Sequence, residues 1–251
     1  MNGLVFSGVP ELLVTCSIVL VAQFVYVLFG FGAGLIAVGG LTLVGVGLQD
    51  VVVMLLLVNV PVELLVVTGS RRAVRWRGLT LVCAGAGVGI WIGSRLLRDA
   101  ELPGLLTALG IFLVATGACF LALPRLGPVR WPKWTAPLAG AASGLLGALF
   151  GTGGPPLIVY YRLAGIAKAT FRANLMTVFL TITLVRVPVY AAFGLLTVPR
   201  LYSALAIAPA VVVGSWLGQR IHLEVSEPRF RALVNVALVV IGGLILVRGL
   251  G

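Results

Sequence analysis

The chain has 251 residues, of which 60% are hydrophobic and only 10% charged, and its mean hydropathy is +1.16. These values exclude an ordinary soluble domain and predict a polytopic membrane protein. The formal net charge of +11 does not indicate a nucleic-acid partner, because arginines in short loops between apolar spans are the usual positive-inside signal.

Apolar segments follow one another along the chain and are separated by short polar stretches. They cover residues 12–28, 35–48, 51–69, 79–97, 104–123, 135–150, 155–165, 173–196, 201–222 and 230–248. A basic connecting loop over 124–134 divides the chain, so we predict an N-terminal repeat over 1–123 and a C-terminal repeat over 135–251.

Two glycine clusters interrupt the apolar pattern. Residues 28–38 read L-F-G-F-G-A-G-L-I-A-V, and residues 149–160 read L-F-G-T-G-G-P-P-L-I-V-Y. Glycine relaxes the backbone, and a proline pair cannot continue a helix but can begin one. We therefore predict a helix ending near Phe150, an unwound turn, and a second helix starting at Pro155. The first four N–H groups of such a helix have no partner inside it, so its start attracts an anion.

The two clusters belong to an internal duplication. Phe29, Gly30, Gly32 and Val38 match Phe150, Gly151, Gly153 and Val159 at one constant spacing. Further along, G-I-W-I-G-S-R at 89–95 matches G-S-W-L-G-Q-R at 214–220 at a slightly larger spacing. Two copies of one broken helix are the main indication of function in this sequence.

The basic residues favour an inverted second copy. One helix over 12–48 would be about 55 Å long against a hydrocarbon core of about 30 Å, so 12–48 and 135–165 are predicted to be re-entrant hairpins. Three crossings then follow each hairpin: 51–69, 79–97 and 104–123, and later 173–196, 201–222 and 230–248. Under this model Arg95, Arg98, Arg200 and Arg248 lie on one side and most other basic residues on the opposite side. The positive-inside rule then places both termini in the periplasm.

An arginine lies at mid-membrane depth within the segment 173–196. A charge at this depth costs at least about 2.5–3.5 kcal/mol on insertion scales, so Arg186 should face a cavity or a partner. Its planar guanidinium suits sulfonate, carboxylate or phosphate oxygens, so we expect it to bind an anionic substrate. Glu63, the other deep charge, would be its partner in the empty site or a proton carrier. The alternative is a purely structural Arg186–Glu63 ion pair.

The predicted anion site combines the two glycine clusters with nearby polar side chains. Its backbone part comprises Gly30, Gly32, Ala33, Gly34, Gly151, Gly153, Gly154 and Pro155. Thr152 adds a hydroxyl at the tip of the second hairpin. Its counterpart in the first hairpin, Phe31, has no such group. Asn59 and Asn174 follow the two hairpins on the next helices, where they either donate to a bound oxyanion or bridge helices.

Other chemistries are poorly supported by the residues. The glycine loop lacks the Lys-Ser/Thr pair of a phosphate-binding loop. Ser143 and His222 could suggest an intramembrane serine protease, but a small packing residue and an interfacial histidine explain them better. Cys16, Cys83 and Cys119 lie inside apolar spans at no metal-ligand spacing. We therefore expect no enzyme activity, no cofactor and no metal site.

The repeated F-G-x-G motif, the repeated G-x-x-x-G-x-R stretch and the chain length together resemble the sulfite exporter TauE/SafE family, also called the toluene-sulfonate uptake permease family. The resemblance covers essentially the whole chain. The family's glycine clusters are usually followed by a proline a few residues on, where this chain has Gly39 and Tyr160. The resemblance implies a bacterial inner-membrane carrier for small organosulfur anions such as sulfite, sulfoacetate or taurine-related sulfonates.

These observations predict an all-α membrane protein of two inverted-topology repeats, each a broken re-entrant hairpin plus three transmembrane helices. We expect a secondary transporter, an exporter or permease, that moves a small anion across the lipid bilayer by alternating access through a midplane site. Without an ATP motif, the drive would be a coupling proton or sodium ion, or the substrate's own gradient. An anion channel on the same scaffold and a non-transporting membrane scaffold are the alternatives. The oligomeric state is not predicted.

Overall fold

The computed structural model describes residues 4–29, 32–70, 79–99, 104–123, 127, 129, 131–165, 168–220 and 227–250. Regular structure within these ranges is helical throughout, which confirms the all-α prediction. The helices are α1 (Val9–Phe29), α2 (Ala33–Val44), α3 (Leu48–Ser70), α4 (Leu79–Arg98), α5 (Leu105–Ala122), α6 (Thr135–Phe150), α7 (Gly154–Leu163), α8 (Lys168–Ala192), α9 (Val198–Arg220) and α10 (Glu227–Leu250).

Six stretches of the described helices are apolar and long enough to cross a membrane, which supports a multi-pass membrane protein. They are Val9–Val27, Leu79–Arg98, Leu105–Ala122, Ala173–Ala192, Val198–Arg220 and Ala232–Gly249. α1 is the unexpected member, since the sequence pattern places it in a re-entrant hairpin. Its 19-residue stretch would span about 28 Å at 1.5 Å per residue, close to the full hydrocarbon thickness.

Both glycine clusters interrupt a helix in the structure. α6 ends at Phe150, as predicted, and α7 begins at Gly154, one residue before the predicted Pro155. Gly151 follows α6 with φ 66°, and Gly32 precedes α2 with φ 101°. Residues with side chains rarely adopt these backbone angles, so the two glycines permit the two turns.

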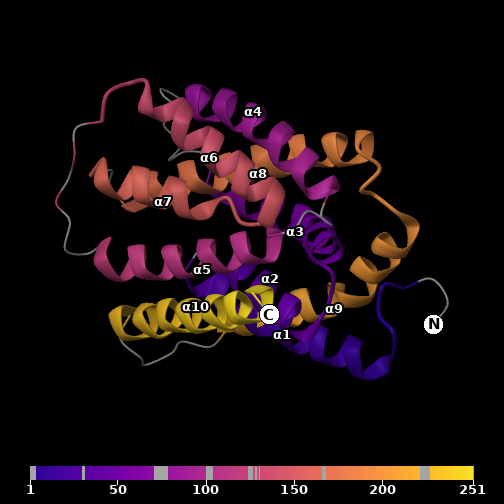
Figure 1. Ribbon diagram of the computed structural model, residues 1–251. Helices are drawn as coiled ribbons and strands as arrows, with labels where there is room; N and C mark the ends of the chain where they lie inside the picture. The colour runs from indigo at the N-terminus through magenta and orange to yellow at the C-terminus, as the bar shows by residue number, and fades with distance from the viewer. Residues whose placement is uncertain are drawn as a thin grey trace.

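One end of the molecule, which we call the Arg200 end, collects the starts of α1, α3 and α9 (Figure 1). Arg200 near the start of α9 forms an ion pair with Asp50 near the start of α3, with Nε 2.7 Å from Oδ1. The amide of Val5, just before α1, donates to Oγ of Ser203 in α9 at 2.8 Å. The first hairpin therefore starts at this end.

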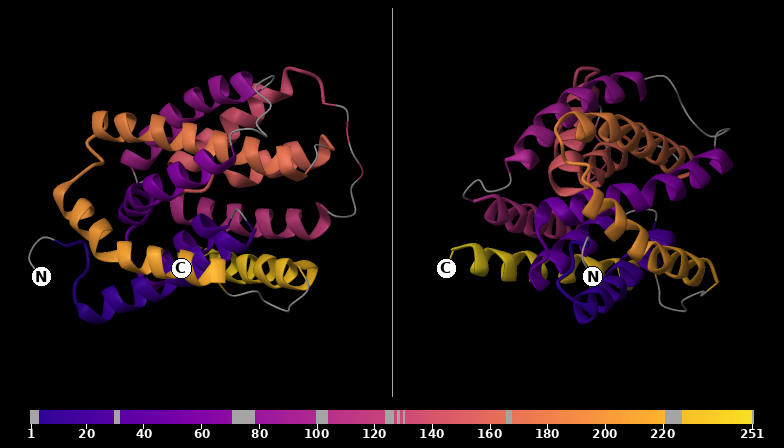
Figure 2. Two further views of the ribbon diagram at one scale, coloured as in Figure 1. Left: turned by 180° about the vertical axis from the view of Figure 1, so that it is seen from behind. Right: turned by 90° about the vertical axis from the view of Figure 1, so that its right-hand side faces the viewer.

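The opposite end, which we call the Trp131 end, holds the start of α6 and the end of α7. The amide of Val129 donates to the carbonyl of Leu163, the last residue of α7, at 2.6 Å. The ring of Trp131, shortly before α6, lies 6.2 Å from the ring of Tyr160 in α7. Figures 1 and 2 show α6 running inward from this end, the chain turning near the middle of the molecule, and α7 returning.

Glycines bring helices from different parts of the chain into backbone contact. A Cβ atom on Gly89 of α4 would lie 2.0 Å from the carbonyl oxygen of Ala141 in α6. A Cβ atom on Gly214 of α9 would lie 2.5 Å from the carbonyl oxygen of Leu20 in α1. α5 and α10 pack together in the same manner at Gly110. Only glycine fits at such distances, so each helix pair is held at a fixed register.

α3 and α8 lie between these glycine-packed pairs and contact each other in the interior. The first half of α3 is central to the core, since Val51, Val52, Val53 and Met54 are fully buried. This packing places the second half of α3 and the middle of α8 beside the two helix breaks.

Candidate functional site

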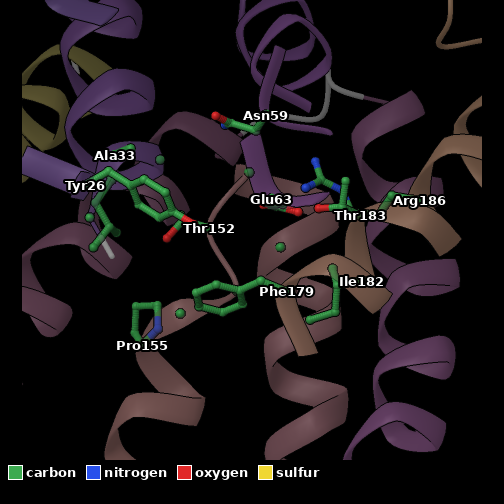
Figure 3. A pocket seen from close by; sticks show the side chains of 17 residues that line it. Tyr26, Ala33, Asn59, Glu63, Thr152, Pro155, Phe179, Ile182, Thr183 and Arg186 are labelled. Atoms are coloured by element: carbon green, nitrogen blue, oxygen red, sulfur yellow. The ribbon is translucent and has the colours of Figure 1, made fainter. Parts of the chain in front are cut away.

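A cavity of about 80 Å³ lies where the two helix breaks meet, lined by both breaks and by side chains of α3 and α8. Figure 3 shows these side chains converging on it. The predicted site residues that line the cavity are Gly32, Ala33, Gly34, Asn59, Glu63, Gly151, Thr152, Gly153, Gly154, Pro155 and Arg186.

The two breaks touch each other beside this cavity. A Cβ atom on Gly34 would lie 2.6 Å from the carbonyl oxygen of Gly151 and 3.2 Å from Cβ of Thr152. The backbone of one hairpin tip therefore rests on the backbone of the other. Any side chain at position 34 would push the tips apart.

The start of α2 offers more free amide groups than the start of α7. The first helical bond of α2 joins the N–H of Ile36 to the carbonyl of Gly32 at 3.0 Å, so the preceding N–H groups have no acceptor in the helix. At the start of α7 the proline pair carries no N–H, which leaves the amides of Gly153 and Gly154. The prediction of four bare N–H groups is therefore wrong for the second break, because its prolines remove two of them.

Ser143 of α6 forms a hydrogen bond to the backbone of the second break. Its side chain is fully buried, and its hydroxyl donates to the carbonyl of Gly153 at 2.6 Å. The packing role expected for Ser143 fits this contact. His222, the other residue of the rejected protease pattern, and Gly30, a predicted backbone donor, lie outside the described residues.

Arg186 reaches the cavity from the middle of α8 and is only 5% exposed. Its Nη2 donates to the hydroxyl of Tyr190, one turn later, at 2.8 Å. The Tyr190 hydroxyl in turn donates to the carbonyl of Ala148 in α6. These contacts hold the guanidinium against α6, while its Nε has no hydrogen-bond partner among the described residues.

Glu63 of α3 faces the cavity beside Thr183 and Arg186 (Figure 3). Its carboxylate accepts a hydrogen bond from the Thr183 hydroxyl, and Oε2 is buried with no partner among the described residues. Arg186 and Glu63 form no direct ion pair among the contacts of the described residues. The structure therefore does not show the purely structural Arg186–Glu63 pair that was the alternative interpretation. Both charged groups therefore face the cavity with unused hydrogen-bonding capacity.

Asn174 does not join the other predicted residues. It lies near the start of α8, is buried, and does not line the described cavity. Asn59 does line it, so the structure separates two asparagines that the sequence pattern treats as equivalent.

The cavity lining also includes residues that the sequence pattern does not single out: Tyr26, Leu35, Gly147, Phe179, Ile182 and Thr183. Thr183 lies three residues before Arg186, which puts both on one face of α8, so this spacing was a usable signal. Tyr26 reaches the cavity from α1, with its hydroxyl 3.5 Å from Sδ of Met176. Nothing in the local sequence of α1 indicates that placement.

Comparison with known proteins gives a consistent result over nearly the whole chain. A family model described as "Sulfite exporter TauE/SafE" matches residues 15–245. The "Probable inner membrane transporter protein TsaS" of Comamonas testosteroni is 25% identical over 205 residues, which cover 81% of this chain and 86% of that protein. The "Probable sulfite/organosulfonate exporter TauE" of Cupriavidus necator is 25% identical over 217 residues, covering 85% of each. No solved structure matches the chain.

Proposed function

The chain belongs to the sulfite exporter TauE/SafE family, whose members are membrane transporters and not enzymes, and on this basis we propose that it carries a small organosulfur or related organic anion across the bacterial inner membrane by alternating access. One observation carries the proposal. Two helix breaks meet at a cavity that also holds a buried arginine with an unpartnered Nε.

The groups around the cavity fit an oxyanion. A buried guanidinium is costly unless it is compensated, and Tyr190 accepts from only one of its nitrogens. Free amides at the start of α2 and the positive end of its helix dipole lie on the same cavity. An anion placed between Arg186 and these amides would satisfy both sets of donors through charge-assisted hydrogen bonds.

The size of the cavity favours a small anion. Its volume is about 80 Å³, and about 10–15 Å³ of the same kind of cavity volume is enough to hold one water molecule. This space suits an oxyanion of a few heavy atoms, such as sulfite, and a larger sulfonate would require the hairpin tips to separate. Sulfite and short sulfonates are therefore the proposed substrates, in line with the name of the Cupriavidus relative, a probable sulfite/organosulfonate exporter.

The arrangement of the hairpins supports inverted repeats. One hairpin starts at the Arg200 end and the other at the Trp131 end (Figure 1), as repeats of opposite orientation would. Gly89 and Gly214, which are equivalent in the duplicated motif, make equivalent contacts, each against the hairpin of the other repeat. We infer that α4 moves with α6 and α7, and that α9 moves with α1 and α2. Each moving body would then contain helices from both repeats of the sequence.

Glu63 is the proposed coupling group. The single positive charge of Arg186 can compensate either the Glu63 carboxylate or the substrate anion in this small cavity, but not both. A proton on Glu63 would remove this repulsion, so each anion would travel with a proton. A dependence of transport on sodium instead of the proton gradient would contradict this assignment.

Counterflow of labelled sulfite tests the proposed transport. Purified protein in liposomes preloaded with unlabelled sulfite should accumulate external labelled sulfite, with a rate that saturates as external sulfite rises. A channel would give neither saturation nor counterflow, and a non-transporting scaffold would give no flux above that of empty liposomes. Either result would reject alternating access.

A further inference from the structure

A second and larger cavity, of about 1090 Å³, lies at the Arg200 end. Its walls are the ends of α2, α4 and α10 and the starts of α3, α5 and α9. It shares no lining residue with the central cavity. α2 connects the two, from Gly32 at the central cavity to Thr42 at this one, a separation of about 15 Å along the helix.

One wall of this outer cavity is a fixed hydrogen-bond network. Besides its ion pair with Asp50, Arg200 donates from Nη2 to Oε1 of Gln49 at 2.7 Å. Gln49 donates from Nε2 to the carbonyls of Leu97 and Arg98 at the end of α4, at 2.8 Å each. The network neutralises Asp50 and ties α3, α4 and α9 together, so the cavity has a preformed wall.

Two further arginines in the lining keep free donors. Arg248 donates from Nη1 to the carbonyl of Leu43 at the end of α2, at 2.8 Å. Arg98 is exposed, and its guanidinium has no hydrogen bond or ion pair among the contacts of the described residues. Since Asp99 is the one remaining carboxylate in the lining, these two arginines leave the outer cavity positive.

Two independent features of the outer cavity indicate an anionic ligand. Thr42 is only 7% exposed and lines the cavity, and its Oγ1 has no hydrogen-bond partner among the described residues. α5 begins at this cavity after Gly104, with no side-chain cap and no acidic residue in its first turn. The start of α5 therefore directs free N–H groups and a positive dipole end toward the cavity.

We propose that the outer cavity is a second anion site, which binds one oxyanion group, a sulfite, sulfonate or phosphate, between Arg98, Arg248 and the start of α5. The oxyanion group belongs either to the transported solute, as it enters or leaves at the Arg200 end, or to an anionic lipid headgroup. Both sources present the same oxygens to the same donors.

Calorimetric titration of purified protein in an uncharged detergent tests the free-ion source, with sodium sulfite and sodium phosphate at constant ionic strength. Arg98→Ala should weaken binding about tenfold, because it removes a charge-assisted hydrogen bond. Arg95→Ala is the matched control, since Arg95 is also exposed on α4 but lies over the Trp91 ring and does not line the cavity. Its affinity should equal that of the unmodified protein.

Native mass spectrometry with added phosphatidylglycerol tests the lipid source. Retention of this lipid by the unmodified protein and by Arg95→Ala, with loss from Arg98→Ala, would identify the lipid phosphate as the ligand. Equal behaviour of Arg98→Ala and Arg95→Ala in both assays would overturn the proposal.

A background of Arg186→Ala keeps the two sites distinguishable. Sulfite binding that survives Arg186→Ala and is then weakened by Arg98→Ala belongs to the outer cavity. Binding that disappears with Arg186→Ala and is unaffected by Arg98→Ala would overturn the outer site and leave the central one. If Arg186→Ala, with the outer site intact, binds the same number of sulfite ions with the same affinity as the unmodified protein, then Arg186 does not bind sulfite. That result would count against the proposed function and not against the outer site.

Discussion

Arg186 differs from the other described arginines in its surroundings. Arg98 and Arg248 are exposed at the Arg200 end, and Arg200 has a carboxylate partner in Asp50. Arg186 lies in the apolar middle of α8 with a tyrosine hydroxyl as its hydrogen-bond acceptor. Such a position is costly, and the proposed anionic ligand would supply the missing acceptors.

Replacing Arg186 by lysine separates charge from geometry. Arg186→Lys keeps one positive charge but loses the planar fork that can bind two oxyanion oxygens and reach Tyr190. We expect the apparent KM for sulfite in proteoliposomes to rise at least about tenfold. Arg95→Lys, which changes an exposed arginine that does not line the cavity, should leave transport unaltered. Normal transport by Arg186→Lys would remove Arg186 from the binding site.

At the scale of the helices, glycine has two separate tasks in this chain. Gly32 and Gly151 permit backbone turns that other residues rarely adopt. Gly89 and Gly214 have ordinary helical backbones and instead allow two helices to touch. A count of glycines in the sequence cannot separate these tasks, because the second depends on a partner helix elsewhere in the chain.

A pair of alanine substitutions on α4 tests the helix contact. Gly89→Ala would place a methyl group 2.0 Å from the carbonyl oxygen of Ala141, so α4 and α6 would have to separate. We expect the free energy of unfolding to fall by about 1–3 kcal/mol, as for overpacked cores, seen as a lower melting temperature in detergent. Gly87→Ala, two residues away, has no atom within 4 Å and should not lower it. Equal melting temperatures for the two variants would show that the contact does not stabilise the protein.

For the whole molecule, the distribution of charge predicts an orientation in the membrane. Arg95, Arg98, Arg200 and Arg248 are the basic residues that the predicted topology places outside. Three of them line one cavity in the structure, together with two aspartates. The remaining loops are more basic, so from the positive-inside rule we expect the Trp131 end to lie in the cytoplasm.

Cysteine labelling in intact cells tests this orientation. With Cys16, Cys83 and Cys119 replaced by serine, single cysteines are introduced as Val198→Cys at the Arg200 end or Trp134→Cys at the Trp131 end. Both positions are well exposed, at 62% and 64%. A membrane-impermeant maleimide should label Val198→Cys in spheroplasts with an intact inner membrane, and Trp134→Cys only after permeabilisation. The reverse pattern would contradict the predicted topology.

Much of the fold could be predicted because it depends on local properties of the chain. The break between Phe150 and Gly154 follows from glycines and a proline pair that act within a few residues. The loss of two free amides at that break also follows from the same stretch, since Pro155 and Pro156 carry no N–H group. The cavity lining was predicted where depth and charge single a residue out, as for Glu63 and Arg186.

What the sequence by itself determined is the class of molecule, its family, the two helix breaks and a buried charge between them, because composition, backbone freedom and depth are properties of single segments. Tertiary structure alone decided which groups meet. Gly34 rests on Gly151, and Thr42 shares a cavity with Arg98 and Arg248, although these residues are far apart in the chain. Such meetings depend on the packing angle and register of helices, which are set by side chains on both partners and leave no local pattern.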